Sequence, residues 1–448
     1  MKISLDGIRH CLEGAIPAVV ATCDAEGVPN VSYVSQVHYV DAGQVALSFQ
    51  FFNKTRANML QNPQLTAYVI DPETGGRYRL ALLYLRTETE GPLFQNMKAK
   101  LAGIASHTGM SDVFILRGAD VCRVLDIEKI PGPEGVRRPP LYNWLSVLRS
   151  LGERLNQQHD MAGLFEEVFS ALEESLAIPH AMLLMADEAE RKLYTVASYG
   201  YAESGVGSEI PFGCGVIGVA AEYRTPIRIT HMASEYGYGK AMRDSLPDQN
   251  QLETAIPFPG LAQPHSQVAV PLLGAGKLLG VLYVESEQDL RFSYDDEDGL
   301  MILGQQLAGV IVQLQNSSEQ ECVDVPVSGR AAVMSGARLQ VRYFPANHSI
   351  FLDETYLIKG VAGAILWRLL QCHVQDQRTE FSNRELRLDP QLCLPDIDDN
   401  LEARLILLQR RLKEKSSALA IIKTGRGRFR LQVTQAVQLS EQLADVAQ

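Results

Sequence analysis

The sequence predicts an α+β protein built from several domains. Its 448 residues are too many for one ordinary hydrophobic core, and about three domains is the expected number. Helical and strand periodicities follow one another along the chain, and two polar or proline-rich stretches interrupt them at 130–140 and 315–324. We therefore expect domains at 1–130, 141–315 and 325–435.

Charge is distributed unevenly along the chain. The whole sequence holds 41 Lys and Arg against 53 Asp and Glu, a net charge of −12. From Val325 to the end there are 17 basic and 13 acidic residues, against 24 and 40 in the rest. Positive charge gathered on one small module favours nucleic-acid binding, so the last segment is expected to report to DNA what the earlier segments sense.

Several sequence features indicate a cytoplasmic protein without a membrane segment. No apolar run approaches the ~20 residues that span a bilayer, and the N-terminus lacks the apolar core of a signal peptide. The seven cysteines are scattered and form no CxxC pair. This usage indicates a reducing compartment and predicts neither a disulfide framework nor a metal site.

In the first segment, strand patterns precede a short basic helix. Asp24–Gly27 is a turn signal between two of the strands, and Asn53 or Thr55 can cap a helix that Pro63 stops. Lys54 and Arg56 then stand at the helix start, where backbone N–H groups and cations both attract a phosphate. A solvated basic turn is the alternative. The strands are expected at 18–23, 28–34 and 45–51.

This layout resembles the pyridoxamine 5′-phosphate oxidase-like family of FMN-binding split barrels. The residues that carry the resemblance are 53–56, Asn62-Pro63 and the strands 80–91 and 121–127, so it covers roughly residues 10–130. It implies a split β-barrel, usually dimeric, that holds FMN; haem or a deazaflavin are alternatives within the family. The cofactor-binding residues implied are Ser48, Asn53, Lys54, Thr55 and Arg56.

Catalysis by this segment stays open. A flavin exchanges electrons without a protein acid or base, so the lack of a recognisable catalytic pair does not exclude an enzyme. An FMN-dependent oxidoreductase is therefore the alternative to a purely sensory role. His38 and His107 are candidate haem ligands, although a lone histidine is more often structural.

The middle segment alternates helices with strands. Apolar residues at helical spacing predict helices at 141–158, 161–176 and 294–315. A glycine-containing hairpin is expected at 274–277. The strands are expected at 181–185, 193–197, 266–273 and 278–284.

These elements resemble a GAF domain over about residues 145–315. The matching phrases are 213–218, 224–229, 268–273 and 279–285. The resemblance implies an α/β sandwich that binds a small molecule, but the loop 235–264, where the ligand lid is expected, identifies no ligand. Cys214 lies between two glycines and is a candidate redox or nitrosative sensor; a small residue filling a tight turn is the alternative.

The last segment combines short strands, three helices and a hairpin. Strands are expected at 340–344 and 349–352, and a helix at 356–372. Ser382 with Glu385 predicts a capping box, and Asp398 or Asp399 can cap the third helix. A hairpin is expected around the turn 424–427.

This order resembles the winged-helix output domain of response-regulator transcription factors over about residues 338–433. The third helix would enter the major groove and the hairpin would touch the DNA backbone. Leu407 departs from the family pattern, because a polar or basic residue is usual there. Contact of this face with a thymine methyl and contact with protein are the two alternatives. The DNA-binding residues implied are Arg404, Arg411, Lys423, Thr424, Arg426 and Arg428.

Together these expectations describe a one-component transcriptional regulator. Split-barrel and GAF domains would sense a flavin, a redox state or a small molecule, and the winged helix would bind double-stranded DNA as a homodimer. The alternative is an FMN-dependent oxidoreductase with regulatory GAF and winged-helix appendages.

Overall fold

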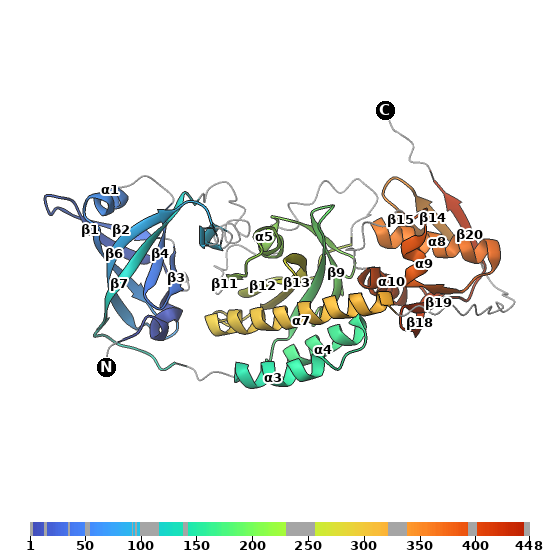
Figure 1. Cartoon of the computed structure of the whole chain (residues 1–448), viewed down its shortest axis with the longest axis horizontal. Helices are drawn as coiled ribbons and strands as arrows, with labels where there is room; N and C mark the ends of the chain where they lie inside the picture. The colour runs from blue at the N-terminus through green and yellow to red at the C-terminus, as the bar shows by residue number, and fades with distance from the viewer. Residues whose placement is uncertain are drawn as a thin grey trace, which may run out of the picture.

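The computed structural model describes residues 3–12, 16–34, 36–49, 54–91, 93–94, 96–98, 116–137, 142–229, 256–320, 338–392 and 401–442. Figure 1 shows three parts in a row, with the N-terminal sheet at one end and the C-terminal elements at the other. Among the described helices, none combines the length and the apolar character that crossing a membrane requires.

The N-terminal part is an antiparallel sheet of seven strands in the order β2-β1-β5-β6-β7-β4-β3. Buried and less buried residues alternate along the strands 18–23 and 64–70, and one face of the sheet packs a core that includes the 3-10 helix η1 (Asp6–Leu12). The short helix α1 (Lys54–Gln61) follows β4. The strands are β1 (Ala18–Cys23), β2 (Pro29–Val34), β3 (Val37–Asp41), β4 (Gln44–Phe49), β5 (Gln64–Ile70), β6 (Arg77–Glu88) and β7 (Gly118–Ile130).

The predicted turn between the first two strands is confirmed. Gly27 has a φ of +83°, and its N–H donates to the carbonyl of Asp24 over 3.1 Å. The Asp24 carboxylate also accepts from the N–H of Val28 at 2.7 Å. The sequence did not indicate β3, because its five residues carry too short an alternation to separate them from a loop.

The middle part is a six-stranded antiparallel sheet in the order β10-β9-β8-β13-β12-β11. Helices α3, α4 and α7 lie on one face of this sheet (Figure 1), and α5 packs on the other. The helices are α3 (Trp144–Leu155), α4 (Met161–Glu174), α5 (Gly215–Tyr223) and α7 (Tyr294–Gln320). The strands are β8 (His180–Asp187), β9 (Lys192–Tyr199), β10 (Glu209–Pro211), β11 (Ile227–Ile229), β12 (Ser266–Gly274) and β13 (Lys277–Ser286).

Two details of the middle part differ from or extend the sequence expectation. The hairpin between β12 and β13 is confirmed, and Ala275 and Gly276 both have positive φ, as a two-residue primed turn requires. Helix α7 continues to Gln320, so the polar stretch expected to be a linker at 315–324 begins inside a helix.

The C-terminal part contains two small sheets around three helices. One sheet has the order β16-β15-β14-β20, with β20 parallel to β14, and the other has the order β17-β19-β18. The helices are α8 (Gly360–Asp376), α9 (Asn383–Leu388) and α10 (Leu401–Lys415). The strands are β14 (Leu339–Phe344), β15 (Ser349–Leu352), β16 (Thr355–Ile358), β17 (Glu380–Ser382), β18 (Leu419–Gly425), β19 (Arg428–Val433) and β20 (Val437–Glu441).

The helix expected at 356–372 begins later than predicted. Thr355–Ile358 pairs with β15 as a strand, and the chain then turns at Gly360, which has a φ of +67°. An apolar residue at every fourth position from Leu357 suggested a helix, but pairing with the neighbouring strand outweighs that local pattern. Ser382 caps α9 as expected, accepting from the N–H of Glu385 at 3.3 Å, while the Glu385 carboxylate pairs with Arg378 instead of closing the box.

The three parts contact one another. One continuous cluster of buried apolar residues runs from Leu164 of α4 and Leu272 of β12 to Ile365 of α8 and Leu407 of α10. At the other end, Arg9 of η1 pairs with Asp298 of α7 at 2.7 Å. The middle part is therefore packed directly against both of its neighbours.

Candidate functional site

The start of α1 presents two cations. Lys54 is the first residue of this eight-residue helix, and its side chain is about half exposed, with Nζ 4.0 Å from the Asp24 carboxylate. Thr55 is buried, and its hydroxyl accepts from the Asn30 amide at 2.8 Å and lies 2.7 Å from the Ser32 hydroxyl. Asn53 lies outside the described residues.

Arg56 turns back into the sheet. Its guanidinium donates to the Thr87 hydroxyl at 3.1 Å, stands 3.8 Å from the Asp120 carboxylate and stacks over the Phe49 ring at 3.9 Å. Burial raises the pKa of Asp120, while the Thr87 hydroxyl and Arg56 oppose that shift. Ser48, on the strand before α1, accepts a hydrogen bond from the N–H of Gln36 at 3.2 Å.

The chemical types of these groups suit a phosphate. Lys54 and Arg56 bring two positive charges to the first turn of a helix, where backbone N–H groups and the helix dipole favour an anion. Lys54 is accessible, whereas Arg56 is held by Asp120 and Thr87 and would exchange those partners for phosphate oxygens. As for haem ligation, His38 is buried in β3, and His107 lies outside the described residues.

A row of polar side chains crosses the middle sheet. His180 of β8, Glu285 of β13 and Gln267 of β12 pair with one another across adjacent strands, so all three point to one face. Gln267 is 0% exposed, and neither atom of its amide has a hydrogen-bond partner in the described part of the chain. The buried Nδ1 of His180 likewise has none there.

Glu285, in the centre of this row, is fully buried. Its carboxylate accepts hydrogen bonds from the N–H of Leu261 at 2.9 Å and from the hydroxyl of Tyr283 at 2.9 Å. Burial raises the pKa of Glu285, and its hydrogen-bond donors, including the Tyr201 hydroxyl, oppose the shift. A buried carboxyl beside an unpaired amide is a polar arrangement that a ligand can complete.

Cys214 lies immediately before helix α5. It is the N-cap residue of α5, is exposed, and is flanked by Gly213 and Gly215, both with positive φ. The thiol is therefore accessible, as expected for a redox-sensitive cysteine, and it makes no capping hydrogen bond.

Two cations of α10, Arg404 and Arg411, do not face solvent. Arg404 donates to the Asp187 carboxylate at 2.7 Å and stacks over the Tyr194 ring at 3.7 Å. Arg411 donates to the carbonyl of Leu357 at 2.9 Å and is also buried. In this arrangement, neither arginine is accessible to DNA.

The hairpin that follows α10 is more open. Lys423 of β18 pairs with Asp160 at 2.9 Å, while Thr424 and Arg426 are exposed at the turn. Arg428 is half-buried at the start of β19. Of the six residues expected to bind DNA, the structure gathers these four on one hairpin and covers Arg404 and Arg411.

Sequence reasoning missed the polar row and the partners of the basic residues. His180, Gln267 and Asp187 belong to strand patterns that read as ordinary core segments, and their contacts join residues far apart in the chain. The only local signal was Leu407, an apolar residue on a helix face where a DNA-reading helix is polar. That residue is 3% exposed and lies within the shared apolar cluster, so this face meets protein.

Comparison with known families identifies two domains. Residues 5–107 match the family model of pyridoxamine 5′-phosphate oxidase, and residues 158–312 match that of the GAF domain. The chain therefore contains an N-terminal split-barrel domain of the pyridoxamine 5′-phosphate oxidase type and a GAF domain. A comparison with curated proteins found no match.

Several solved structures are similar to parts of this chain. The GAF domain of a phosphoenolpyruvate-protein phosphotransferase from Coxiella burnetii is 19% identical, covering 40% of this chain and 97% of that one, with a TM-score of 0.30. An FMN-binding protein from Syntrophomonas wolfei is 17% identical, covering 29% and 86%, with a TM-score of 0.24. Free methionine-R-sulfoxide reductase from Neisseria meningitidis is 20% identical, covering 39% and 91%, with a TM-score of 0.30.

Proposed function

We propose that this chain is a one-component transcriptional regulator, in which a flavin-type barrel and a GAF domain control DNA binding by the C-terminal part. The observation that carries the proposal is the order of elements after residue 338. A strand sheet, the helices α8, α9 and α10, and a hairpin with basic residues at its turn follow one another as in a winged helix. The remainder of the chain is acidic, which suits a sensor attached to a basic output module.

In this proposal the C-terminal part is a winged helix, with α10 as its recognition helix and β18 and β19 as its wing. The turn of the wing exposes Thr424 and Arg426, which suit contacts with phosphates. Arg404 is the residue on α10 suited to a base edge, once it is separated from Asp187.

The barrel is proposed to hold FMN at the start of α1. Lys54 and the N–H groups of the first turn would hold the phosphate, and Arg56 would join them on leaving Asp120. Bound FMN would supply electron transfer, so a change in its redox state is the input suited to this domain. The residues of this chain bind and orient the cofactor.

The GAF domain is proposed to bind a polar small molecule at the row formed by His180, Glu285 and Gln267. A buried primary amide without partners loses the hydrogen bonds it makes with water, which costs about 1–3 kcal/mol. A ligand that offers a donor and an acceptor side by side would satisfy both amide atoms at once. Cys214, the N-cap residue of α5, is a second candidate input through oxidation.

A homodimer is proposed for the whole chain. Val31 and Tyr33 are 65% and 79% exposed on β2, which is an edge strand of the first sheet. Exposed apolar side chains on an edge strand suit coverage by a second copy. Native mass spectrometry measures both the stoichiometry and any retained cofactor, and a purely monomeric species would contradict this part of the proposal.

One route links the barrel to the output through helix α7. Arg9 of the barrel lies between the rings of Tyr39 and Tyr294, and the Tyr294 hydroxyl donates to the Leu12 carbonyl at 3.0 Å. Tyr294 begins helix α7, which runs along the GAF domain towards the C-terminal part (Figure 1). A shift of α7 can therefore carry a change in the barrel to the far end of the molecule.

The proposal is tested by selecting genomic DNA fragments with the purified chain at low salt. The selection uses oxidised FMN, reduced FMN and no FMN, and includes the variant Asp187→Asn because α10 is covered in this arrangement. Enrichment of specific fragments is expected in at least one condition. If neither protein enriches any fragment in any condition, the chain is not a DNA-binding regulator.

The second candidate function is an FMN-dependent oxidoreductase with regulatory appendages. The match of residues 5–107 to the pyridoxamine 5′-phosphate oxidase family favours it. A visible spectrum of the isolated protein distinguishes the two absorption bands of oxidised flavin from the Soret band of haem. Steady-state turnover of a reductant or a pyridoxine-like substrate by the flavin-loaded protein would favour this candidate over the regulator.

A further inference from the structure

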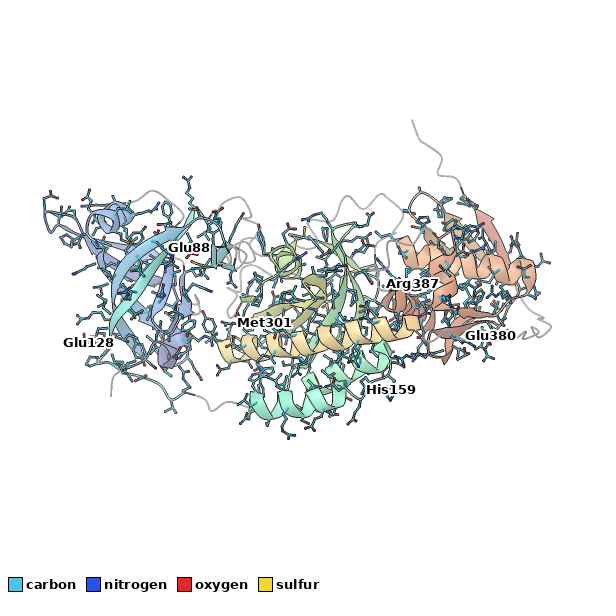
Figure 2. The ribbon with its side chains drawn as sticks, viewed as in Figure 1. Glu88, Glu128, His159, Met301, Glu380 and Arg387 are labelled. Atoms are coloured by element: carbon cyan, nitrogen blue, oxygen red, sulfur yellow. The ribbon has the colours of Figure 1, made fainter. Side chains whose placement is uncertain are left out.

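Among the residues that the structure describes, three ion pairs join the GAF domain to the C-terminal part, and in each of them the carboxylate belongs to the GAF domain. Asp187 at the end of β8 pairs with Arg404 of α10 at 2.7 Å. The two outer pairs are Asp160 with Lys423 at 2.9 Å, and Glu209 with Lys359 at 3.0 Å. Figure 2 labels His159, the neighbour of Asp160, in the turn between α3 and α4 on the side of the C-terminal part.

The three pairs differ in how much they stabilise the contact. The side chains of Lys423 and Asp160 are 43% and 34% exposed, so solvent and salt weaken their attraction. Arg404 and Asp187 are 6% and 8% exposed, and there the loss of one partner leaves a buried charge uncompensated. The central pair therefore dominates, and the outer pairs fix the orientation of the two surfaces.

Apolar contacts and further hydrogen bonds complete this interface around the central pair. Arg410 donates to the carbonyl of Val196 on β9 at 3.1 Å, and burial lowers the pKa of Arg410. At the end of the helix, the Ser204 hydroxyl donates to the Glu414 carboxylate at 2.5 Å. Leu407 is also buried, so the face of α10 expected to read DNA is covered.

We propose that the carboxylates of Asp160, Asp187 and Glu209 form an internal substitute for a nucleic-acid backbone, so that the GAF domain and DNA compete for the same face of the C-terminal part. This inference rests on the proposed function. Arg404 and Lys423 are residues that the winged-helix resemblance assigns to DNA, and each is matched by an acidic side chain of the sensor. The closed arrangement is the state that cannot bind DNA, and release of α10 from β9 and α4 is the switch.

The acidic surface of the GAF domain and the basic surface of the C-terminal part support competition between the GAF domain and DNA. A DNA duplex presents regularly spaced negative charges, and a protein surface that binds it gathers cations. Here the acidic partner comes from three separate elements, β8, β10 and the N-cap of α4, which converge on one basic surface. Neutralising the central carboxylate should therefore favour the open state and increase affinity for DNA.

The test compares the wild-type chain with Asp187→Asn. Asparagine has the same shape, and its side-chain oxygen can still accept the bond that Asp187 receives from the N–H of Glu190 at 3.0 Å. The matched control is Glu188→Gln, which removes the same charge from the next residue, where the carboxylate pairs with Arg224 inside the GAF domain. If asparagine does not open the contact, Asp187→Lys is the second variant, because it places a positive charge beside Arg404.

Two readouts are measured on each full-length protein. Hydrogen–deuterium exchange of 401–415 reports whether α10 is released, and anisotropy of a labelled mixed-sequence duplex at low salt reports DNA binding. Asp187→Asn is expected to speed exchange in α10 and to bind the duplex about tenfold more tightly or better, since the loss of a buried partner disfavours the closed state by more than the 1.4 kcal/mol that corresponds to tenfold. Glu188→Gln is expected to match the wild type in both.

The outcomes separate this inference from the proposed function. Suppose that Asp187→Asn releases α10, and that the variant and the wild type bind DNA equally well. Competition between the GAF domain and DNA is then wrong, but the DNA-binding function stands. Release of α10 with no DNA bound by any variant overturns the DNA-binding function, and the surfaces are then only a domain contact. If neither substitution at Asp187 speeds exchange in α10, the central pair does not hold the closed state and the inference is wrong.

Discussion

Arg404 of helix α10 donates a hydrogen bond to Asp187 at the end of strand β8, which lies 217 positions earlier in the chain. The same guanidinium stacks on the ring of Tyr194 in the adjacent strand β9. A residue expected to read a DNA base is thus held by a carboxylate and an aromatic ring of the sensor domain. The central question for this molecule is what separates them.

We expect the effects of substituting Arg404 and Asp187 on the free energy of unfolding to be strongly coupled. Asp187→Ala and Arg404→Met should each lower the free energy of unfolding of the protein by about 3–5 kcal/mol, because each leaves one buried charge without its partner. The double variant should cost clearly less than the sum of the two. Thermal and denaturant unfolding measure the cycle, and the exposed pair Arg149–Glu153 is the control, with a coupling of about 0.3–0.5 kcal/mol. Additive effects at Arg404 and Asp187 would show that the pair contributes nothing.

Flavin retention should depend on both cations at the start of α1. Lys54→Ala and Arg56→Ala are each expected to weaken FMN binding, by about tenfold for the loss of one charge-assisted hydrogen bond to phosphate. Fluorescence titration with FMN measures the change. Arg79→Ala, which removes an exposed cation paired with Glu128 on the same sheet, is the control and should leave affinity unchanged. Equal FMN occupancy in all three variants would contradict a phosphate site at α1.

Gln267→Met should stabilise the ligand-free protein. Methionine has a similar volume and needs no hydrogen bonds, so the substitution removes a penalty of about 1–3 kcal/mol for an unpaired buried amide. A rise in melting temperature without added ligand is the expected result. As a contrast, Thr195→Val removes a buried hydroxyl that lies 2.9 Å from Ser208, and it should lower the melting temperature. A loss of stability in Gln267→Met would mean that the amide is already satisfied.

The contribution of Glu285 to stability should fall as the pH rises. Because its pKa is raised in the folded state, the folded protein holds a proton that the unfolded chain has lost above the ordinary glutamate pKa. Stability is therefore lost from that pH upwards until the folded pKa is passed. His180, whose pKa is lowered by burial, acts in the opposite direction below its ordinary pKa.

Comparison with Glu285→Gln isolates this effect. Melting temperatures of the two proteins are measured from acid to neutral pH, so that His180 contributes equally to both. Because only the wild type can lose a proton at this position, its stability relative to that of the variant should fall as the pH rises. A difference that does not change with pH would show that Glu285 does not titrate differently in the folded protein.

Arg426 should contribute to DNA affinity without contributing to sequence preference. In the Asp187→Asn background, Arg426→Ala is expected to weaken binding to all duplexes about equally and to reduce the slope of log K against log salt by about one. Anisotropy titrations at several salt concentrations measure this slope. Arg342→Ala removes a cation of β14 that pairs with Glu354 and serves as the control. An unchanged slope in Arg426→Ala would place the hairpin away from the DNA.

Much of the fold follows from local patterns in the sequence. The strands β1, β2 and β12 and the helices α3 and α4 lie close to their predicted positions, because each combines a clear period with capping or turn residues. Short elements such as β3, β10 and β11 have too few residues to show a period. The start of α8 was misplaced because the pairing of β16 with β15 is a contact between strands that no helical period reveals.

The candidate sites divide in the same way. The basic turn at α1 and the accessible Cys214 could be found from residue type and spacing, since both depend on a few consecutive residues. The row of His180, Glu285 and Gln267 could not, because its members come from three strands that are joined only by the register of the sheet.

The sequence by itself determined that this chain has an acidic sensor region and a basic C-terminal part, because charge and local periodicity are properties of consecutive residues. It also marked Leu407 as an unusual residue on the face of α10. Only the tertiary structure decided where the basic residues lie, because the partners of Arg404 and Lys423 are carboxylates of a different domain, brought near by the packing of α10 on β9 and α4. The charge of a segment indicates which partners it can attract, whereas the fold determines which partner it contacts.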